Sequence, residues 1–307
     1  MPHRFLRAVL VSAFALALLA APAVAADAVL LRRAYKPGDK YLAVMNSIQD
    51  ITQTAADGSV SKIKQSQRTE MLLEVLAVGP DGAAQTKVTY QRMALVIESP
   101  KIKIDYDSGD PAKKDVDSQL LTISKCIVGK SITATITDRG EATAIGGIEP
   151  IKAEVLDRIP AGKNRDDAKV GLERSLGVES FKQQLVAFGI PMPAEAQSAG
   201  QTWNWDQNLS LGFADMAVHT ACKVEAVAEK TVDVSVSATL AVTKSSPGFT
   251  VALDPAGRNT GKMTIDRANA AISSGSSQAS TTMTVVVQNN TITSHTVGTT
   301  EFAVTRQ

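Results

Sequence analysis

Aromatic side chains are scarce in this chain of 307 residues, where Phe, Trp and Tyr together make up 4% of the sequence. A hydrophobic core must therefore be built mainly from Val, Ile, Leu, Met and Ala. A charge excess of either sign is also missing, because 32 basic residues face 31 acidic ones. Nucleic-acid binding needs a concentrated basic surface, so the composition argues against a DNA- or RNA-binding protein.

The sequence also lacks the short motifs that mark common catalytic sites. It contains no Gly-x-Ser-x-Gly nucleophile elbow and no glycine-rich phosphate loop. We therefore expect no catalytic residues, no cofactor and no metal site, and we predict that the protein is not an enzyme. The alternative is a hydrolase that brings Ser294 or Cys222 together with a histidine and an acid from distant parts of the chain.

The N-terminus predicts export. Arg4 and Arg7 precede an uncharged apolar run over residues 8–19, and Ala23-Val24-Ala25 follows as a small-x-small cleavage pattern. The run is shorter than the roughly 20 residues that a membrane-spanning helix needs. We predict cleavage after Ala25, no membrane span in the mature chain, and a periplasmic or extracellular product.

Residues 26–148 are predicted to form an N-terminal antiparallel β region. Segments rich in residues that favour strands are separated by turn signals at Asp57-Gly58, Asp81-Gly82 and Asp138-Arg139-Gly140. In residues 131–137, Ile132, Ala134 and Ile136 alternate with polar residues, which places the apolar set on one face of a strand.

Residues 149–197 change period and predict a bridge of two or three short helices. Ile151, Val155 and Ile159 fall four residues apart, and Gly177 and Gly189 stand where C-terminal caps would lie. Residues 198–307 then return to strands, the clearest being the alternation over residues 232–242. One buried and one wet face is typical of antiparallel sheets. We therefore predict a mainly β protein in which two curved antiparallel sheets, sandwich-like or half-barrel-like, are joined by the helical bridge.

Several motifs in the same order resemble a known family. They include Pro37-Gly38-Asp39-Lys40-Tyr41, Val88-Thr89-Tyr90, Asp105-Tyr106-Asp107-Ser108 and Gly129-Lys130-Ser131, after an export signal. Together they resemble a family of exported bacterial proteins known only as a domain of unknown function. The resemblance implies a bacterial origin, an envelope or extracellular location and a mainly β fold, and it implies no activity and no site residues.

The two cysteines of the chain are Cys126 and Cys222. An even number of cysteines in an exported protein permits one disulfide bond between them. Two buried free thiols are the alternative, because free cysteine behaves as a small apolar residue.

Two other clusters have the residue types of metal sites. Residues 105–117 contain five aspartates, the ligand type that calcium needs, but their spacing does not fit an EF-hand and two lysines interrupt them. His219 and Cys222 resemble half of a zinc site, yet on a strand these positions face opposite sides. We interpret the first cluster as a solvated hairpin loop and expect no zinc at the second.

Trp203 and Trp205 are the only tryptophans. Being two residues apart on a predicted strand, they share one face and offer a platform for an apolar or sugar ligand. The alternative is that they fill the joint between the helical bridge and the second sheet. We name both as candidate ligand contacts.

These observations favour a non-enzymatic protein of the cell envelope that binds an apolar ligand such as a lipid in a curved sheet. The alternative is a structural or protein-interaction module that uses the surfaces and edges of the sheet. The two differ in one respect: a carrier needs a lined pocket of roughly 300–1,000 Å³, whereas an interaction module can be packed solid.

Overall fold

The computed structural model describes residues 28–307 apart from residues 160–164, 166–168, 170–171, 174–175, 186–187, 189, 212, 254–256 and 289. The predicted signal peptide, residues 1–25, lies outside the described residues. So does Gly189, which was predicted as a helix cap.

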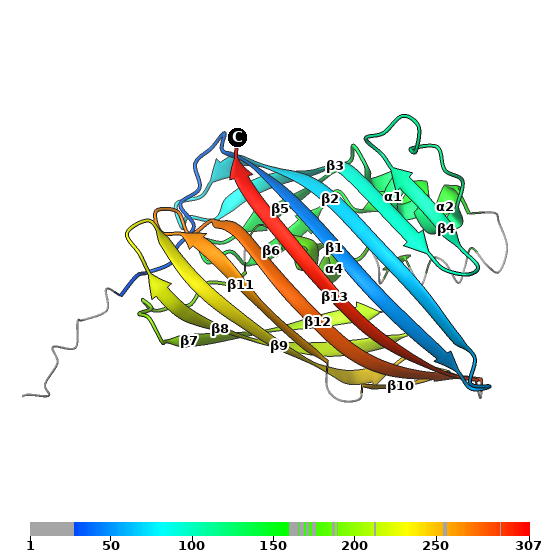
Figure 1. The fold of residues 1–307 in the computed structure, drawn as a ribbon. Coiled ribbons are helices and arrows are strands. Elements are labelled where there is room, and N and C mark those ends of the chain that lie inside the picture. Colours follow the sequence, from blue (N-terminus) through cyan, green and yellow to red (C-terminus); the bar gives the residue numbers. More distant parts are fainter. Residues whose placement is uncertain are drawn as a thin grey trace, which may run out of the picture.

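Strands dominate the chain, and thirteen of them form one antiparallel sheet (Figure 1). The strands of the N-terminal part are β1 (Lys40–Ala55), β2 (Val60–Val78), β3 (Ala84–Glu98), β4 (Lys103–Asp107), β5 (Ser131–Ile136) and β6 (Ala142–Gly146). Those of the C-terminal part are β7 (Thr202–Leu211), β8 (Ala214–Val227), β9 (Thr231–Ser245), β10 (Phe249–Leu253), β11 (Arg258–Asp266), β12 (Ile272–Val287) and β13 (Asn290–Arg306).

The order across the sheet is β6-β5-β3-β2-β1-β13-β12-β11-β9-β8-β7, with β4 paired to β3 and β10 paired to β12. The first and last strands are therefore neighbours, in register from Tyr41 opposite Arg306 to Ala55 opposite Ile292. Figure 1 shows this pairing as a blue strand beside a red one. The prediction of two sheets was wrong: β1 and β13 join the two β regions into one open sheet. Local periodicity carries no signal for a partner at the other end of the chain.

Turns and strands predicted from local patterns are confirmed. Gly58 and Gly82 adopt positive φ angles of 81° and 79° in the turns after β1 and β2, a conformation that favours glycine. The alternation predicted over residues 232–242 lies within β9, where Val232 and Val234 are buried and Asp233 is exposed.

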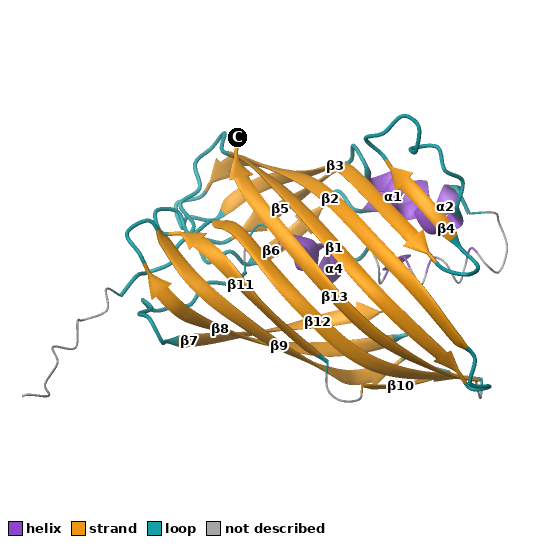
Figure 2. Cartoon of the chain, in the orientation of Figure 1, coloured by secondary structure: helices purple, strands orange, loops and turns teal. Residues whose placement is uncertain are grey.

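Short helices cover one face of the sheet, which we call the inner face (Figure 2). They include α1 (Thr122–Ile127), α2 (Glu149–Asp157) and α4 (Val178–Gln184), with a 3-10 turn η1 (Gln119–Leu121) before α1. Helix α1 was not predicted, because six residues are too few to show a helical period. Gly177 is the N-cap of α4, at φ −78° and ψ 167°, and so lacks the left-handed conformation of the predicted C-terminal cap.

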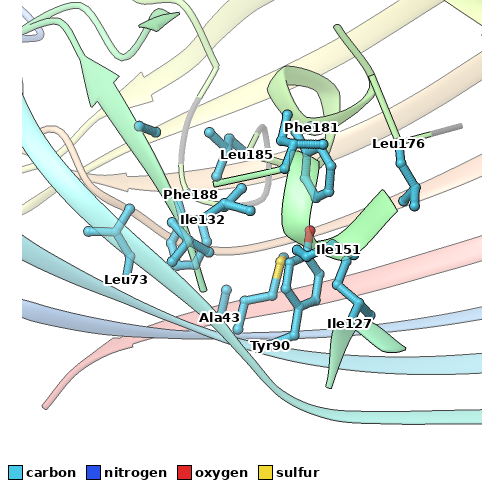
Figure 3. Close-up of a cluster of buried hydrophobic side chains, with 14 of the residues drawn as sticks. Ala43, Leu73, Tyr90, Ile127, Ile132, Ile151, Leu176, Phe181, Leu185 and Phe188 are labelled. Atoms are coloured by element: carbon cyan, nitrogen blue, oxygen red, sulfur yellow. The ribbon is translucent and has the colours of Figure 1, made fainter. Parts of the chain in front are cut away.

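The larger core lies between the helices and the N-terminal strands. Figure 3 shows Tyr90 of β3 and Ile132 of β5 close to Phe181 of α4 and Ile151 of α2. The Tyr90 and Phe181 rings meet edge to face with centroids 6.4 Å apart. Burying these apolar side chains is the main force that attaches the helices to the sheet.

A smaller core fills the inner face of the C-terminal strands. Segments outside the strands also contribute to it: residues 29–31 and 190–192 supply Val29, Leu31, Ile190 and Met192, and the turn after β11 supplies Ala270. Val29 also pairs with Gln197, and the two backbones exchange hydrogen bonds of 2.8 Å in both directions.

The long strands extend beyond both cores as a single layer. None of residues 44–55 of β1 and none of the described residues among 273–306 in β12 and β13 has a buried side chain. Ile48 and Val297, on neighbouring strands, are 59% and 47% exposed. In the described part of the chain, no helix is long and apolar enough to cross a membrane.

The β1–β13 junction is fixed at its end by a buried carboxylate. The Asp39 side chain is 7% exposed and accepts hydrogen bonds from the Lys36 amide at 3.1 Å, from Tyr41 Oη at 3.2 Å and from Arg306 Nη2 at 2.5 Å. Burial alone would raise the Asp39 pKa, but these donors outweigh burial and hold the pKa below its ordinary value.

We expect Asp39→Asn to lower the free energy of unfolding near neutral pH by about 1–3 kcal/mol, because donors placed for a carboxylate lose their charged acceptor. A carboxylate with a lowered folded pKa stabilises the protein above its unfolded pKa of about 3.9, and this contribution is lost as the pH falls through the folded pKa. Urea unfolding of the wild type and the variant should therefore differ at neutral pH and converge in acid. Asp50→Asn, at an exposed position of the same strand, is the control and should leave stability unchanged. A difference between wild type and Asp39→Asn that persisted in strong acid would contradict this role.

Candidate functional site

The two edges of the sheet, β6 and β7, both contact α4, which lies between them. Gln183 of α4 donates a hydrogen bond to the Asn208 carbonyl of β7, while Tyr90 of β3 donates one to the Gln184 side chain. Helix α4 is thus attached to an edge strand and to the inner face. A polar side chain at the edge also satisfies a carbonyl that has no neighbouring strand.

A pocket of about 720 Å³ opens along this junction between the sheet edges, and we call it the seam pocket. Its walls come from the end of β5 and start of β6, from α4 and the residues after it, from residues 191–197, and from β7. The apolar side chains that line it are Ile136, Ala142, Leu185, Phe188, Pro191, Met192, Pro193, Ala194, Trp203 and Trp205.

Residues 190–197 form one wall because they are tied to neighbouring segments on two sides. Met192 N donates to the Arg139 carbonyl at 2.7 Å, and Arg139 Nε donates to the Met192 carbonyl at 3.0 Å. On the other side, Trp203 Nε1 donates to the Pro191 carbonyl at 3.1 Å. Pro191 and Pro193 prevent a helix here, so the segment stays extended between the two sheet edges.

Both tryptophans named from the sequence line the seam pocket. Trp203 is 8% exposed and belongs to the smaller core. It therefore also matches the alternative interpretation, in which a tryptophan fills the space between the helical bridge and the C-terminal strands. Trp205 is half-buried. Its Nε1 is buried near the Cys222 thiol and has no other partner among the described residues. The platform of two tryptophans on one strand face is therefore present at a pocket wall.

Most charged side chains at the seam pocket are in ion pairs, whereas Glu195 is exposed and has no ion pair among the described residues. Glu179 accepts from Lys182 Nζ at 2.8 Å, and Glu141 lies 3.6 Å from Arg139 Nη2. Asp206 contacts His219 Nδ1 at 2.8 Å on the side of β7 and β8 that points away from the helices, which we call the outer face.

The cysteines do not form the disulfide bond that the sequence permitted. Both are free and buried: Cys126 lies in the larger core and Cys222 on β8 in the smaller one. The two cores are built from different strands and segments, which the count of cysteines could not reveal. Burial raises the pKa of Cys222 to about 12, and the Trp205 indole opposes that rise only in part.

The aspartate-rich segment is not the hairpin loop that was predicted, because Asp105 and Asp107 lie in β4 and the other aspartates follow that strand. Asp107 forms two hydrogen bonds with Arg92, at 2.9 and 2.6 Å, which lower its pKa, and Asp105 pairs with Lys113 at 2.8 Å. No group of three potential metal ligands occurs among the residues that the structure describes. His219 lies on the outer face while Cys222 points inward, so the two face opposite sides of the sheet.

Several residues of the seam pocket were missed by the sequence analysis. Arg139 and Gly140 were noted only as a turn, and Lys182 and Gln183 only as part of a helix. Three sequence features taken together could have indicated these residues: the turn at residues 138–140, the prolines after residue 190 and the pair of tryptophans. No spacing rule relates these three parts, because tertiary contacts alone bring them together.

The comparisons with known proteins give a family but no activity. A model of the family described as "Family of unknown function (DUF6263)" matches residues 81–272, which include every residue of the seam pocket except Tyr35. A search of curated proteins found no match.

Solved structures show only distant similarity. A lipovitellin structure concerned with lipid–protein interactions matches 89% of this chain at 10% identity with a TM-score of 0.47, and the chain spans 26% of that protein. OpdQ of Pseudomonas aeruginosa matches 87% of this chain and 99% of its own at 7% identity with a TM-score of 0.23. DynF of Micromonospora chersina matches 92% and 85% at 11% identity with a TM-score of 0.20. With TM-scores below 0.5, these similarities support no inference about function.

The buried thiols lead to a direct test. We expect neither cysteine of the folded, unreduced protein to react with iodoacetamide at mildly alkaline pH, because alkylation needs an accessible thiolate and burial raises the pKa of both groups. After unfolding in urea without a reductant, both should react, and the mass should rise by two adducts. An unreactive unfolded chain that gains two adducts only after reduction would show a disulfide bond and contradict the structure.

Proposed function

This chain belongs to the DUF6263 family of unknown function, and we propose that it is a non-enzymatic binding protein that holds an amphipathic small molecule in the seam pocket. The observation that carries the proposal is the pocket itself: a lined space between the two sheet edges that includes both tryptophans of the chain.

The size and lining of the seam pocket support this function. Its volume of about 720 Å³ falls within the roughly 300–1,000 Å³ that is typical of small-molecule sites. One wall is apolar, from Leu185 and Phe188 across to Trp205, whereas Gln183, Asn204 and Gln207 give the pocket a polar side. A ligand with an apolar body and a polar end matches this division better than a wholly apolar one.

The proposal places the ligand at the junction of the sheet edges rather than on the inner face. The larger and smaller cores occupy the inner face of the strands near the helices, so side chains of the protein fill that space. A lipid lying across a curved sheet, as first expected, would have to displace these cores. The seam pocket requires no such rearrangement.

Ion pairs among the charged groups of the pocket support a protein that binds its ligand without converting it chemically. Glu141, Glu179 and Asp206 each contact a basic side chain. Carboxylates held in this way are suited to fixing the walls of the pocket. As part of the same proposal we keep export of the mature chain to the periplasm or the extracellular space, on the strength of the N-terminal pattern.

A second function, a structural or interaction module of the envelope, is favoured by the single-layer end of the sheet. There Ile48 and Val297 expose apolar surface on neighbouring strands of the outer face. Under this alternative, the purified chain would take up no amphiphile, and cross-linking in intact cells would identify a protein partner at these strands.

Tryptophan fluorescence tests the proposed function without a label, because both emitters lie at the pocket. We expect titration of the delipidated mature chain with dodecanol to shift the emission to shorter wavelength and to saturate, since the alkyl chain displaces water from Trp205. Ala194→Phe, which adds bulk at the pocket wall, should weaken binding at least about ten-fold by occupying ligand volume.

Ala268→Phe is the matched control, because Ala268 is also exposed but does not line the pocket. It should bind dodecanol as the wild type does. An emission spectrum that stays constant up to the solubility limit of dodecanol would reject the proposed function. Equal weakening by both substitutions would place the ligand elsewhere.

A further inference from the structure

Arg33 is a buried cation without a counterion among the described residues. The residue is 5% exposed, and its Nε and Nη2 atoms are buried with no hydrogen-bond partner. Burying an unpaired charge is costly, so such groups are usually paired or serve a ligand. Neither core needs a charge at this position, and a Met or Leu there would pack without that cost.

The groups that face Arg33 do not neutralise it. Its charge interacts with the phenols of Tyr35 and Tyr41, both of which are neutral at ordinary pH. Asp138, whose backbone carbonyl accepts from the Arg33 amide, already pairs with Arg32 Nε at 3.3 Å. Asp39, the buried acid near Tyr41, is committed to Arg306.

Arg33 lies directly behind the wall of the seam pocket. That wall contains Tyr35 and Gly140, and a Cβ atom built on Gly140 would lie 3.5 Å from Arg33 Nε and 2.8 Å from the Ile190 carbonyl. Because Gly140 has no side chain, only backbone atoms separate the Arg33 guanidinium from the pocket at this point. Its field crosses protein rather than water, so solvent screens it weakly.

Other positive charges at the pocket cannot play this part. Lys182 pairs with Glu179 at 2.8 Å, and Arg139 is held by the Met192 carbonyl and Glu141. Arg33 therefore supplies an unpaired positive charge behind the wall, whereas Lys182 and Arg139 are paired and, among the described residues, the exposed Glu195 leaves one unpaired carboxylate at the pocket opening.

We propose that the seam pocket selects amphiphiles with an anionic head, of the carboxylate class, and that buried Arg33 is the countercharge that selects them. This inference rests on the proposed function and adds the ligand class. The apolar body of the ligand lies against Trp205 and Phe188, and its head lies at the Tyr35 and Gly140 wall. Arg33 acts as a specificity-determining residue through its field across this wall.

The test compares dodecanoate with dodecanol, which share one alkyl chain and differ in the charge of the head. Tryptophan fluorescence of the mature chain is titrated at a pH at which the carboxylate is fully ionised. We expect the wild type to bind dodecanoate more tightly by a factor on the order of ten, the size that a weakly screened charge at this range supplies. Arg33→Met should lose this preference while its affinity for dodecanol stays unchanged.

Two controls make the result specific. Lys62→Met removes an exposed positive charge of β2 that does not line the pocket, and it should keep the preference for dodecanoate. Urea unfolding without ligand should show Arg33→Met to be at least as stable as the wild type, because the substitution removes an unpaired buried charge. Dodecanoate should raise the urea midpoint of the wild type more than that of the variant.

The possible failures are distinguishable. If the wild type binds dodecanoate and dodecanol equally, the role of Arg33 is wrong while the proposed function stands. If it binds neither, the proposed function itself is wrong. Should Arg33→Met fail to fold, the wild-type ratio still decides the question, and Arg33→Lys, which keeps the charge, should preserve that ratio.

Discussion

Antiparallel pairing between β1 and β13, over residues 41–55 and 292–306, decides the architecture of this protein. Without it, the N-terminal and C-terminal strands would form two separate sheets. With it, the whole sheet has its edges at β6 and β7, and the helical segment between these two strands in the sequence also lies between them in space. The buried Asp39, bonded to Arg306, fixes the register at one end of this pairing.

The seam pocket follows from that arrangement. An antiparallel sheet whose edges do not pair with each other leaves edge backbone that must be covered or bonded. Helix α4 and residues 190–197 cover these edges but do not fill the space between them, because prolines keep the second segment extended. Tryptophans on β7 line the remaining space, and Arg33 on the N-terminal segment places a charge behind it. The pairing of β1 with β13 therefore determines both the fold and the position of the seam pocket.

Local patterns in the sequence predicted much of this structure. The alternation of β9, the Asp-Gly turns and the shared face of Trp203 and Trp205 depend on neighbours within a few residues, and all three are confirmed. The number of sheets was predicted wrongly, because the pairing of β1 with β13 depends on residues more than 200 positions apart. The same limit explains why one disulfide seemed possible: Cys126 and Cys222 became separated by folding, in two different cores.

The candidate site was predicted only in its tryptophans. Arg33 gives no signal in the sequence, where it is the second of two adjacent arginines and looks like part of a solvated segment. Its neighbour Arg32 does meet that expectation, with an ion pair to Asp138 and hydrogen bonds to nearby carbonyls. The difference arises because alternate residues of an extended segment face opposite ways, and Arg33 faces the protein.

The most direct test of the account is photo-cross-linking with a fatty acid that carries a diazirine near its methyl end, followed by mapping of the labelled peptides by mass spectrometry. The account predicts labels on residues 179–197 and on β7 around Trp205, and their loss when unlabelled dodecanoate is added in excess. Labels on the single-layer end of β1, β12 and β13, or no competable label, would contradict a ligand site at the junction of the sheet edges.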